Sequence, residues 1–306
     1  MNRYQFPEGF FWGAAASGPQ TEGFANKPHR SIWDSWYAEQ PNRFFQQIGP
    51  QKVCETYSKY KEDVALMKQT GFNSFRTSIQ WSRLIDDFET GTPNAEAVRF
   101  YNNYFDEMIA SGIEPMINLY HFDMPEILQK QYGGFESPHV TDLFARFART
   151  AFELFGHKVK YWITFNEPIV PNEIFPQAIY DIASNIRDNY DNMKWYLAEI
   201  GIAMDIQSEG PVLADGVIDD TFRIELMEEH LEQLHRAISE GANCFGVHQW
   251  TFIDNWSWIN SFKRRYGFWR LDLESGERQI KRNALWFAQL AASNGFTPGA
   301  FIKGNK

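Results

Sequence analysis

Short apolar segments alternate along the chain with longer segments whose apolar residues recur every three or four positions. The short segments have the composition of buried strands, and the longer ones have the period of amphipathic helices. In the segment 221–240, Ile224, Met227, Leu231, Leu234 and Ile238 form one apolar stripe. This alternation is typical of strand–helix units around a parallel sheet, so the chain is expected to be an α/β protein.

Six strands and six helices are predicted. The strands are Phe10–Ser17, Ser74–Ile79, Glu114–Tyr120, Lys160–Asn166, Lys194–Glu199 and Cys244–Phe252. The helices are Gln51–Thr70, Ala95–Ser111, Pro138–Phe155, Pro176–Asn189, Thr221–Glu240 and Lys281–Asn294. No repeat, low-complexity tract or linker divides the sequence, so we expect one domain over residues 1–306.

Polar, acidic or aromatic residues stand where several predicted strands end. They are Gln80, Trp81, His121, Asn166, Glu167, Glu199 and Trp250. In a (β/α) barrel the carboxyl ends of the strands carry the active site. The pattern therefore favours a barrel of the TIM type with its functional residues at that end.

Net charge and aromatic content indicate which kinds of ligand the protein is expected to bind. Binding to the phosphate backbone of a nucleic acid needs clustered Lys and Arg, and the formal net charge of −10 argues against it. Nucleic acid is therefore not expected as a partner. Aromatic residues make up 17% of the 306 residues. Such rings fill large cores, and they also stack on sugar faces.

The two cysteines, Cys54 and Cys244, match no zinc spacing and cannot build a disulfide framework, so we expect reduced core thiols. No apolar run reaches the roughly 18 residues that cross a bilayer, and the first residues lack the features of a signal peptide. A cytoplasmic protein without membrane contact is expected. Metal, nucleotide and flavin motifs are absent from the sequence, so no cofactor is expected.

Two carboxylates stand in similar positions. Glu167 ends the segment Tyr161–Pro168, and Glu199 lies within Trp195–Gly201. Two carboxylates at strand ends can face each other across a barrel mouth, and cleavage of a glycosidic bond needs such a pair. The structural alternative is that each Glu caps a helix or pairs with an Arg.

Six motifs in order identify a family. They are Phe6–Ala15, Pro19–Gly23, Phe75–Arg83, Tyr120–Pro125, Thr164–Pro168 and Trp250–Trp258. Through them the chain resembles glycoside hydrolase family 1, the retaining β-glycosidases, along nearly its whole length. The resemblance implies a (β/α)8 barrel.

The resemblance also implies roles for individual residues. Glu167 matches the general acid/base and Glu199 the nucleophile, whose carboxyl groups a retaining mechanism needs about 5–5.5 Å apart. Asn166 would hold the sugar 2-hydroxyl, and Arg76 would sit beside Glu199 and keep it ionised.

Gln20, His121 and Trp250 match positions that bind or stack on the sugar. Without the resemblance, His121 would be interpreted as a core histidine and Trp250 as a core aromatic residue.

The segment 254–268 points to a branch of the family. Ser257 stands where ordinary β-glucosidases carry a Glu, and a hydroxyl can donate to a 6-phosphate that a carboxylate would repel. With Lys263, Arg264 and Tyr266 downstream, the segment resembles 6-phospho-β-glycosidases, which bind phosphate through a Ser, a Lys and a Tyr. The usual Lys position holds Arg264, so either cation can supply the charge. A solvated basic turn is the alternative.

Trp258 resembles the tryptophan of 6-phospho-β-galactosidases that contacts the 4-position of the sugar. It slightly favours substrates with galactose 6-phosphate units over those with glucose 6-phosphate units.

One interval departs from the family. Only about thirty residues separate Glu167 from Glu199, where the family has two further barrel strands with their helices. We therefore expect an incomplete barrel of about six βα units that lacks the family's strands 5 and 6. Exposed strand edges would then favour a homo-oligomer. Ala198 and Ile200 also replace polar neighbours of the nucleophile.

The sequence thus predicts hydrolysis, with retention, of β-glycosidic bonds in 6-phosphorylated disaccharides. One alternative is a degenerate, non-catalytic relative that binds phosphosugars or is inactive. A second is a β-glucosidase for unphosphorylated sugars.

Overall fold

The computed structural model describes residues 3–167 and 176–304. Six parallel strands form its central sheet, in the spatial order β7, β6, β3, β2, β10, β8. Every predicted strand is confirmed, with ends that agree within two residues. The strands are β2 (Phe11–Ala15), β3 (Ser74–Ser78), β6 (Glu114–Tyr120), β7 (Tyr161–Phe165), β8 (Trp195–Ile200) and β10 (Cys244–Trp250).

The strand order is that of a barrel open at one place. The first of these strands in the chain, β2, pairs with the last, β10, with Trp12 opposite Val247 and Ala15 opposite Trp250. The opening falls between β7 and β8, which follow one another in the chain, and neither has a second strand neighbour among the described residues. All six residues of β8 are only half-buried, because one side of this strand is uncovered.

Aromatic rings from four strands bring the two edges of the sheet toward each other. The Phe245 ring of β10 lies 5.9 Å from Tyr161 of β7 and 5.4 Å from Tyr196 of β8, centroid to centroid. Phe11 of β2 contacts both Phe245 and Tyr161. Because β7 and β8 both contact one ring of β10, the sheet is curled rather than flat.

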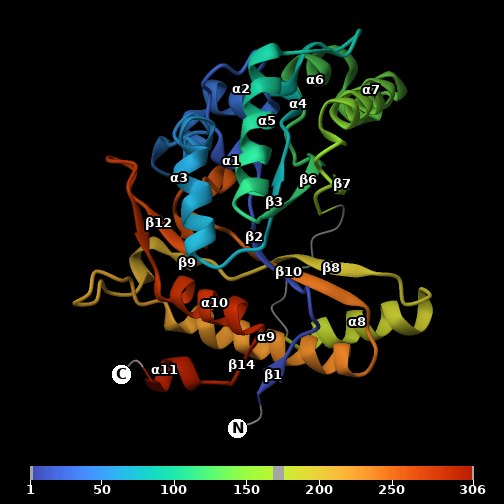
Figure 1. Ribbon diagram of the computed structural model, residues 1–306. Helices are drawn as coiled ribbons and strands as arrows, with labels where there is room; N and C mark the ends of the chain where they lie inside the picture. The colour runs from blue at the N-terminus through green and yellow to red at the C-terminus, as the bar shows by residue number, and fades with distance from the viewer. Residues whose placement is uncertain (1–2, 168–175, 305–306) are drawn as a thin grey trace.

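Six long helices follow the predicted pattern. Figure 1 shows α3 and α5 on one part of the molecule and α9 beside α8 and α10 on another, and these pairs are in contact. The helix expected from Gln51 begins only at Thr56, because Glu55 has a left-handed backbone with φ of 57°. The helices are α3 (Thr56–Gln69), α5 (Ala95–Ala110), α7 (Pro138–Phe155), α8 (Gln177–Asn189), α9 (Thr221–Ser239) and α10 (Arg282–Ser293).

Local signals explain where two of these helices begin. The Asn94 side chain accepts a hydrogen bond from the Ala97 amide at 2.8 Å and caps α5. Pro138 occupies the first turn of α7, where its missing N–H costs nothing. The buried face of α7 has the three- and four-residue spacing of the sequence pattern: Val140, Leu143, Phe144, Phe147, Ala151 and Phe155.

Short elements complete the described chain. Antiparallel pairs form between β1 and β14, β4 and β5, β9 and β11, and β12 and β13. Those strands are β1 (Tyr4–Gln5), β4 (Ile85–Asp87), β5 (Thr92–Pro93), β9 (Met204–Asp205), β11 (Arg264–Arg265), β12 (Trp269–Leu271), β13 (Arg278–Ile280) and β14 (Gly295–Phe296). The short helices are α1 (Gly18–Thr21), α2 (Ile32–Glu39), α4 (Trp81–Leu84), α6 (Glu126–Tyr132) and α11 (Ala300–Gly304), with 3-10 turns at 41–43, 45–47, 134–136, 206–208 and 258–260.

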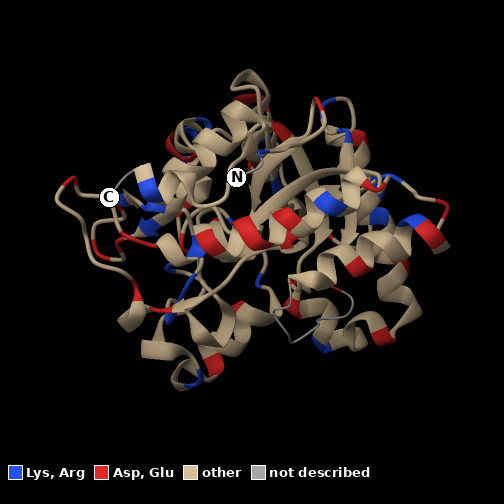
Figure 2. Ribbon diagram, turned by 90° about the horizontal axis from the view of Figure 1, so that it is seen from below, with Lys and Arg blue, Asp and Glu red and all other residues tan. Residues whose placement is uncertain are grey.

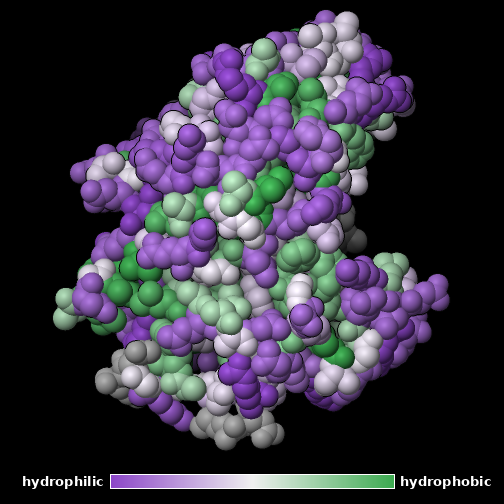
Figure 3. All heavy atoms as spheres, in the orientation of Figure 1, coloured by the Kyte–Doolittle hydropathy of each residue, from purple (hydrophilic) through white to green (hydrophobic). Residues whose placement is uncertain are grey.

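The distribution of charge, the exposed apolar residues and the state of the two cysteines can be compared with the sequence predictions. Basic and acidic residues are interspersed in Figure 2, and Figure 3 shows small apolar areas among a largely hydrophilic surface. Within α8, Ile182 is 56% exposed. Cys54 and Cys244 are buried and free, as expected. In the two described ranges, no helix combines the length and the hydropathy that a bilayer crossing requires.

Candidate active site

Arg76 of β3 lies at the centre of the site and is only 1% exposed. Its Nη1 donates to Oε1 of Glu199 on β8. Its Nη2 donates to Oδ1 of Asn166, directly after β7, at 2.6 Å. The planar guanidinium can hold two acceptors at once, so one side chain connects both edge strands to the middle of the sheet. Arg76 therefore lies beside Glu199, where the resemblance places it.

Burial and the Arg76 charge have opposite effects on the pKa of Glu199. Burial raises the pKa of Glu199 to about 7, although the Arg76 cation lowers it. A nearby second carboxylate, Glu167, raises it further. Arg76 thus favours the ionised form of Glu199, in the expected direction, but desolvation has the larger effect on the pKa.

Glu167 is the second carboxylate of the site. It follows β7, is exposed, and has a left-handed backbone with φ of 37°. Its charge acts on Glu199, so the two carboxylates are electrostatically coupled neighbours. Pro168, the last residue of the same motif, lies outside the described residues. The pair combines one exposed carboxylate with one half-buried carboxylate.

His121 and Trp250 present parallel rings next to Asn166. The ring centroids of His121 and Trp250 are 5.8 Å apart with an interplanar angle of 7°. His121 Nε2 lies 3.4 Å from Nδ2 of Asn166, and its Nδ1 lies 3.4 Å from Nδ2 of Asn118. Burial, with a contribution from the Arg76 cation, holds the pKa of His121 well below its usual range. His121 is therefore a neutral group at neutral pH.

Gln20 lies on α1 and its polar atoms are held by the protein. Its Nε2 donates to the Trp256 carbonyl at 2.8 Å, and its Oε1 accepts from Ser17 Oγ at 2.7 Å. These bonds tie α1 to the chain that follows β10.

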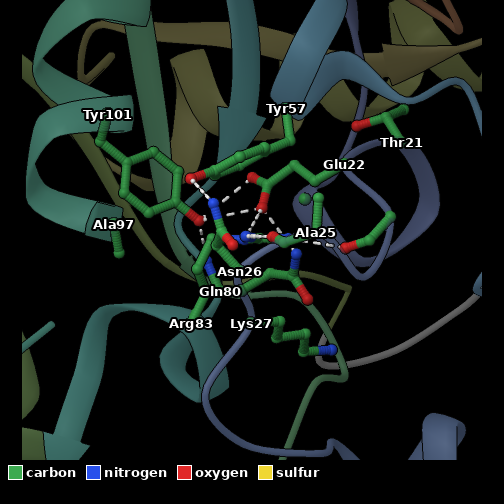
Figure 4. Close-up of polar contacts among 12 residues, drawn as sticks. Thr21, Glu22, Ala25, Asn26, Lys27, Tyr57, Gln80, Arg83, Ala97 and Tyr101 are labelled. Atoms are coloured by element: carbon green, nitrogen blue, oxygen red, sulfur yellow. Dashed lines mark hydrogen bonds and ion pairs between the residues drawn. The ribbon is translucent and has the colours of Figure 1, made fainter.

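A buried network fixes the turn just after Gln20. Figure 4 shows Glu22 facing Arg83, Gln80 and Tyr101. Oε2 of Glu22 accepts from Arg83 Nε at 2.7 Å and from Gln80 Nε2 at 2.6 Å. Arg83 also donates to the carbonyls of Gly23 and Ala25. The network attaches the chain after α1 to α4.

Ser257 and Trp258 lie on the same side of the molecule as His121. Ser257 is buried, and the Trp258 ring stacks on Trp33 at 4.4 Å and 27°. Trp258 also faces His121 at 6.1 Å and 24°. Sequence reasoning did not identify Trp33, because only the tertiary structure brings α2 beside this segment.

The basic residues of the segment have different environments. Lys263 is half-buried and Arg264 is exposed on β11, while the next residue, Arg265, is buried against Asp254. Within the described residues, neither the Lys263 nor the Arg264 side chain has an ion-pair or hydrogen-bond partner. Tyr266 is half-buried, and its amide donates to Asp254 at 3.1 Å.

Two further polar residues surround Arg76 and were not identified from the sequence. His248 of β10 shares a hydrogen bond with Ser74 Oγ at 2.8 Å, and burial lowers its pKa to about 3. Its ring meets that of Tyr196 edge-on at 5.4 Å. Burial raises the pKa of Tyr196 to about 12. His248 precedes Trp250 by two positions, and this spacing along a strand was the available signal.

Within residues 3–167 and 176–304, no three His, Cys, Asp or Glu side chains gather in a way that could hold a metal ion.

The sequence is similar to known glycosidases. The sequence model of "Glycosyl hydrolase family 1" matches residues 2–173 and 170–296. "6-phospho-beta-glucosidase GmuD" of Bacillus subtilis is 31% identical over 96% of this chain and 99% of that protein. That alignment runs over 464 positions, far more than the 306 residues here, so much of the relative has no counterpart in this chain.

Two further proteins extend the comparison. "Beta-glucosidase 24" of Oryza sativa subsp. japonica is 42% identical over 55% of this chain and 34% of its own length. The solved structure "Family 1 b-glucosidase from Thermotoga maritima" superposes with a TM-score of 0.88, over 97% of this chain and 100% of that one, at 22% identity. This likeness shows that the fold is that of the family barrel.

Proposed function

This chain belongs to glycosyl hydrolase family 1, and on that basis we propose that it hydrolyses 6-phospho-β-glucosides or 6-phospho-β-galactosides with retention of configuration. The observation that carries the proposal is the position of Arg76, which holds Glu199 and Asn166 together beside Glu167. The similarity to a 6-phospho-β-glucosidase along nearly the whole chain supports the phosphorylated substrate.

In the proposed reaction, Glu167 and Glu199 act on opposite sides of the anomeric carbon. Glu167 donates its proton to the glycosidic oxygen while the Glu199 carboxylate attacks the carbon, and the aglycone leaves as an alcohol. Glu167 then removes a proton from water, the water oxygen displaces Glu199, and the free sugar forms with net retention.

Exposure and charge distinguish the two carboxylates. Exposed Glu167 can exchange protons with solvent, whereas Glu199 faces the Arg76 cation. The Arg76 cation lowers the pKa of Glu199 and so favours the ionised nucleophile, against the opposing effects of burial and of the Glu167 charge.

Sugar recognition is assigned to the neighbouring polar and aromatic side chains. We propose that Asn166 binds the 2-hydroxyl and that Gln20, His121 and Trp250 bind or stack on the ring. The parallel His121 and Trp250 rings and the contact from Asn166 to His121 support a single sugar-binding surface.

Phosphate recognition is assigned to Ser257, Tyr266 and a cation at 263 or 264. A phosphate carries up to two negative charges and accepts several hydrogen bonds, so a cation with no protein partner suits it. Half-buried Lys263 is the stronger candidate, because a partly desolvated charge interacts more strongly than an exposed one. Trp258, held between Trp33 and His121, is proposed to border the 4-position of the sugar.

We also propose that the chain lacks strands 5 and 6 of the family barrel. The two segments matched by the family meet near residue 170, between β7 and β8, where the sheet is open. The unpaired edges there favour association with a second copy of the chain. The free buried thiols of Cys54 and Cys244 fit a cytoplasmic location.

The open sheet also favours a second candidate, a relative that binds phosphosugars without turnover. A nucleophile on a half-buried edge strand is held less rigidly, and a displacement of about 1 Å can cost about 10²-fold in rate. A β-glucosidase for unphosphorylated sugars is the third candidate, supported by the rice relative and opposed by Ser257.

Hydrolysis of four chromogenic substrates tests the proposal. These are a β-glucoside and a β-galactoside, each with and without a 6-phosphate, assayed with the wild-type chain and Glu199→Gln. Turnover of only the phosphorylated substrates, lost in the variant, is expected. Turnover of only the unphosphorylated pair would favour the β-glucosidase. No turnover, with glucose 6-phosphate raising the melting temperature, would favour the binding protein.

A further inference from the structure

Lys281 is a buried cation outside the site described above. It immediately precedes α10 and is 0% exposed. Its Nζ lies 2.9 Å from both carboxylate oxygens of Asp254 and 2.6 Å from Oε1 of Glu209. One cation thus holds carboxylates from two segments that are distant in sequence.

Asp254 shapes the backbone that carries the phosphate-binding candidates. Its Oδ1 accepts hydrogen bonds from the amides of Tyr266 at 3.1 Å and Gly267 at 2.8 Å. Arg265 Nη1 lies 3.5 Å from its Oδ2. Burial raises the pKa of Asp254, but Lys281 and Arg265 outweigh burial and hold that pKa below its usual value. Asp254 is therefore an ionised acceptor for the end of this loop.

Glu209 belongs to the segment that pairs with the same loop. In the β9–β11 pair, Asp205 lies opposite Arg264, and the Ile206 amide donates to the Lys263 carbonyl at 2.9 Å. The backbone on both sides of the two candidate cations is thus fixed, on one side through β9 and on the other through Asp254. Lys281 is the group that Asp254 and Glu209 share.

We propose that Lys281 is a positioning residue for phosphate recognition, which acts by holding Asp254 and Glu209 so that Ser257, Lys263 and Tyr266 converge on the 6-phosphate. The inference rests on the proposed function and adds a specificity determinant to it. A bound phosphate needs donors from several points of one loop. A change in the geometry of that loop is therefore expected to weaken phosphate binding while it leaves the positions of Glu167 and Glu199 nearly unchanged. Within the described part of the chain, Lys281 is bonded to neither Glu199 nor Arg76.

The experiment compares Lys281→Met with a matched control, Arg278→Met. Arg278 is also a buried cation and stands three residues earlier on β13, but it pairs with Asp63 of α3 at 3.1 Å. Both variants remove a buried charge. Lys281→Met is expected to raise KM for the phosphorylated substrate about tenfold or more, with kcat changed less than about threefold. Arg278→Met is expected to leave that KM within about threefold of wild type.

Glu209→Gln provides a milder change if Lys281→Met does not fold. It keeps the shape of the side chain and removes one of the two charges on Lys281, so the same rise in KM is expected with a smaller size. An equal loss of kcat and no rise in KM in both variants, or an equal rise in KM in Arg278→Met, would overturn the inference.

Calorimetric binding of glucose 6-phosphate separates this inference from the proposed function. If the wild-type chain turns over no substrate but binds glucose 6-phosphate more tightly than Lys281→Met and Glu209→Gln do, the proposed function fails and the positioning role stands. Equal affinities in all three proteins, or no binding by any, would overturn the positioning role whatever the outcome for turnover.

Discussion

Arg76 and Glu199 form an ion pair between β3 and β8, across the curled sheet. The same guanidinium holds Asn166 next to β7. Because β7 and β8 have no strand between them among the described residues, this arginine and the aromatic contacts of Phe245 are what join the two edges on the inner side. The catalytic geometry of the proposed enzyme therefore depends on side-chain contacts where a complete barrel would have backbone pairing.

The pH dependence of kcat/KM reports on this ion pair. Attack requires ionised Glu199, whose pKa burial raises to about 7, so the rate is expected to fall as the pH drops below about 7. Arg76→Met removes the cation that lowers this pKa, and the acid limb should move about one to three pH units higher. A pH–rate profile of both proteins with one chromogenic substrate tests this. An acid limb at the same pH in the two proteins would contradict it.

The choice between Lys263 and Arg264 can be made with two alanine variants. Lys263→Ala is expected to raise KM for the phosphorylated substrate about 10- to 100-fold, the size of a lost charge-assisted hydrogen bond. Arg264→Ala should change it less than about threefold, because that side chain is exposed and screened by solvent. The unphosphorylated substrate is the control, and neither variant should alter its KM. The opposite ranking of the two variants would assign the phosphate to Arg264.

The open edges of the sheet predict self-association. Thr164 of β7 is exposed, and a lysine there would bring a charge to the unpaired edge. We expect the wild-type chain to form dimers in light scattering after size exclusion, and Thr164→Lys to shift them toward monomers. Thr164→Ser, which adds no charge, should behave like wild type. A wild-type chain that is monomeric at every concentration tested would refute association through these edges.

The sequence by itself determined the six strands, the six long helices and the family. These features depend on local periods, such as the three- and four-residue spacing along α7, and on short motifs such as the one that ends at Glu167. Helix and strand periods follow from backbone geometry, so neighbouring residues are sufficient to predict them. The interval between Glu167 and Glu199 was also short enough to predict that the barrel is incomplete.

Only the tertiary structure decided which distant residues act on one another. Arg76 reaches Asn166 and Glu199 across 90 and 123 positions of sequence. The pKa of Glu199 follows mainly from how deeply the fold buries its carboxyl group, and motif matching indicated only the opposing effect of Arg76. From the sequence, Lys281 was predicted only as the first residue of a helix. Its proposed positioning role depends on its ion pairs with Asp254 and Glu209, which only the tertiary structure shows. Burial and charge pairing depend on the whole chain, so no local pattern could have supplied them.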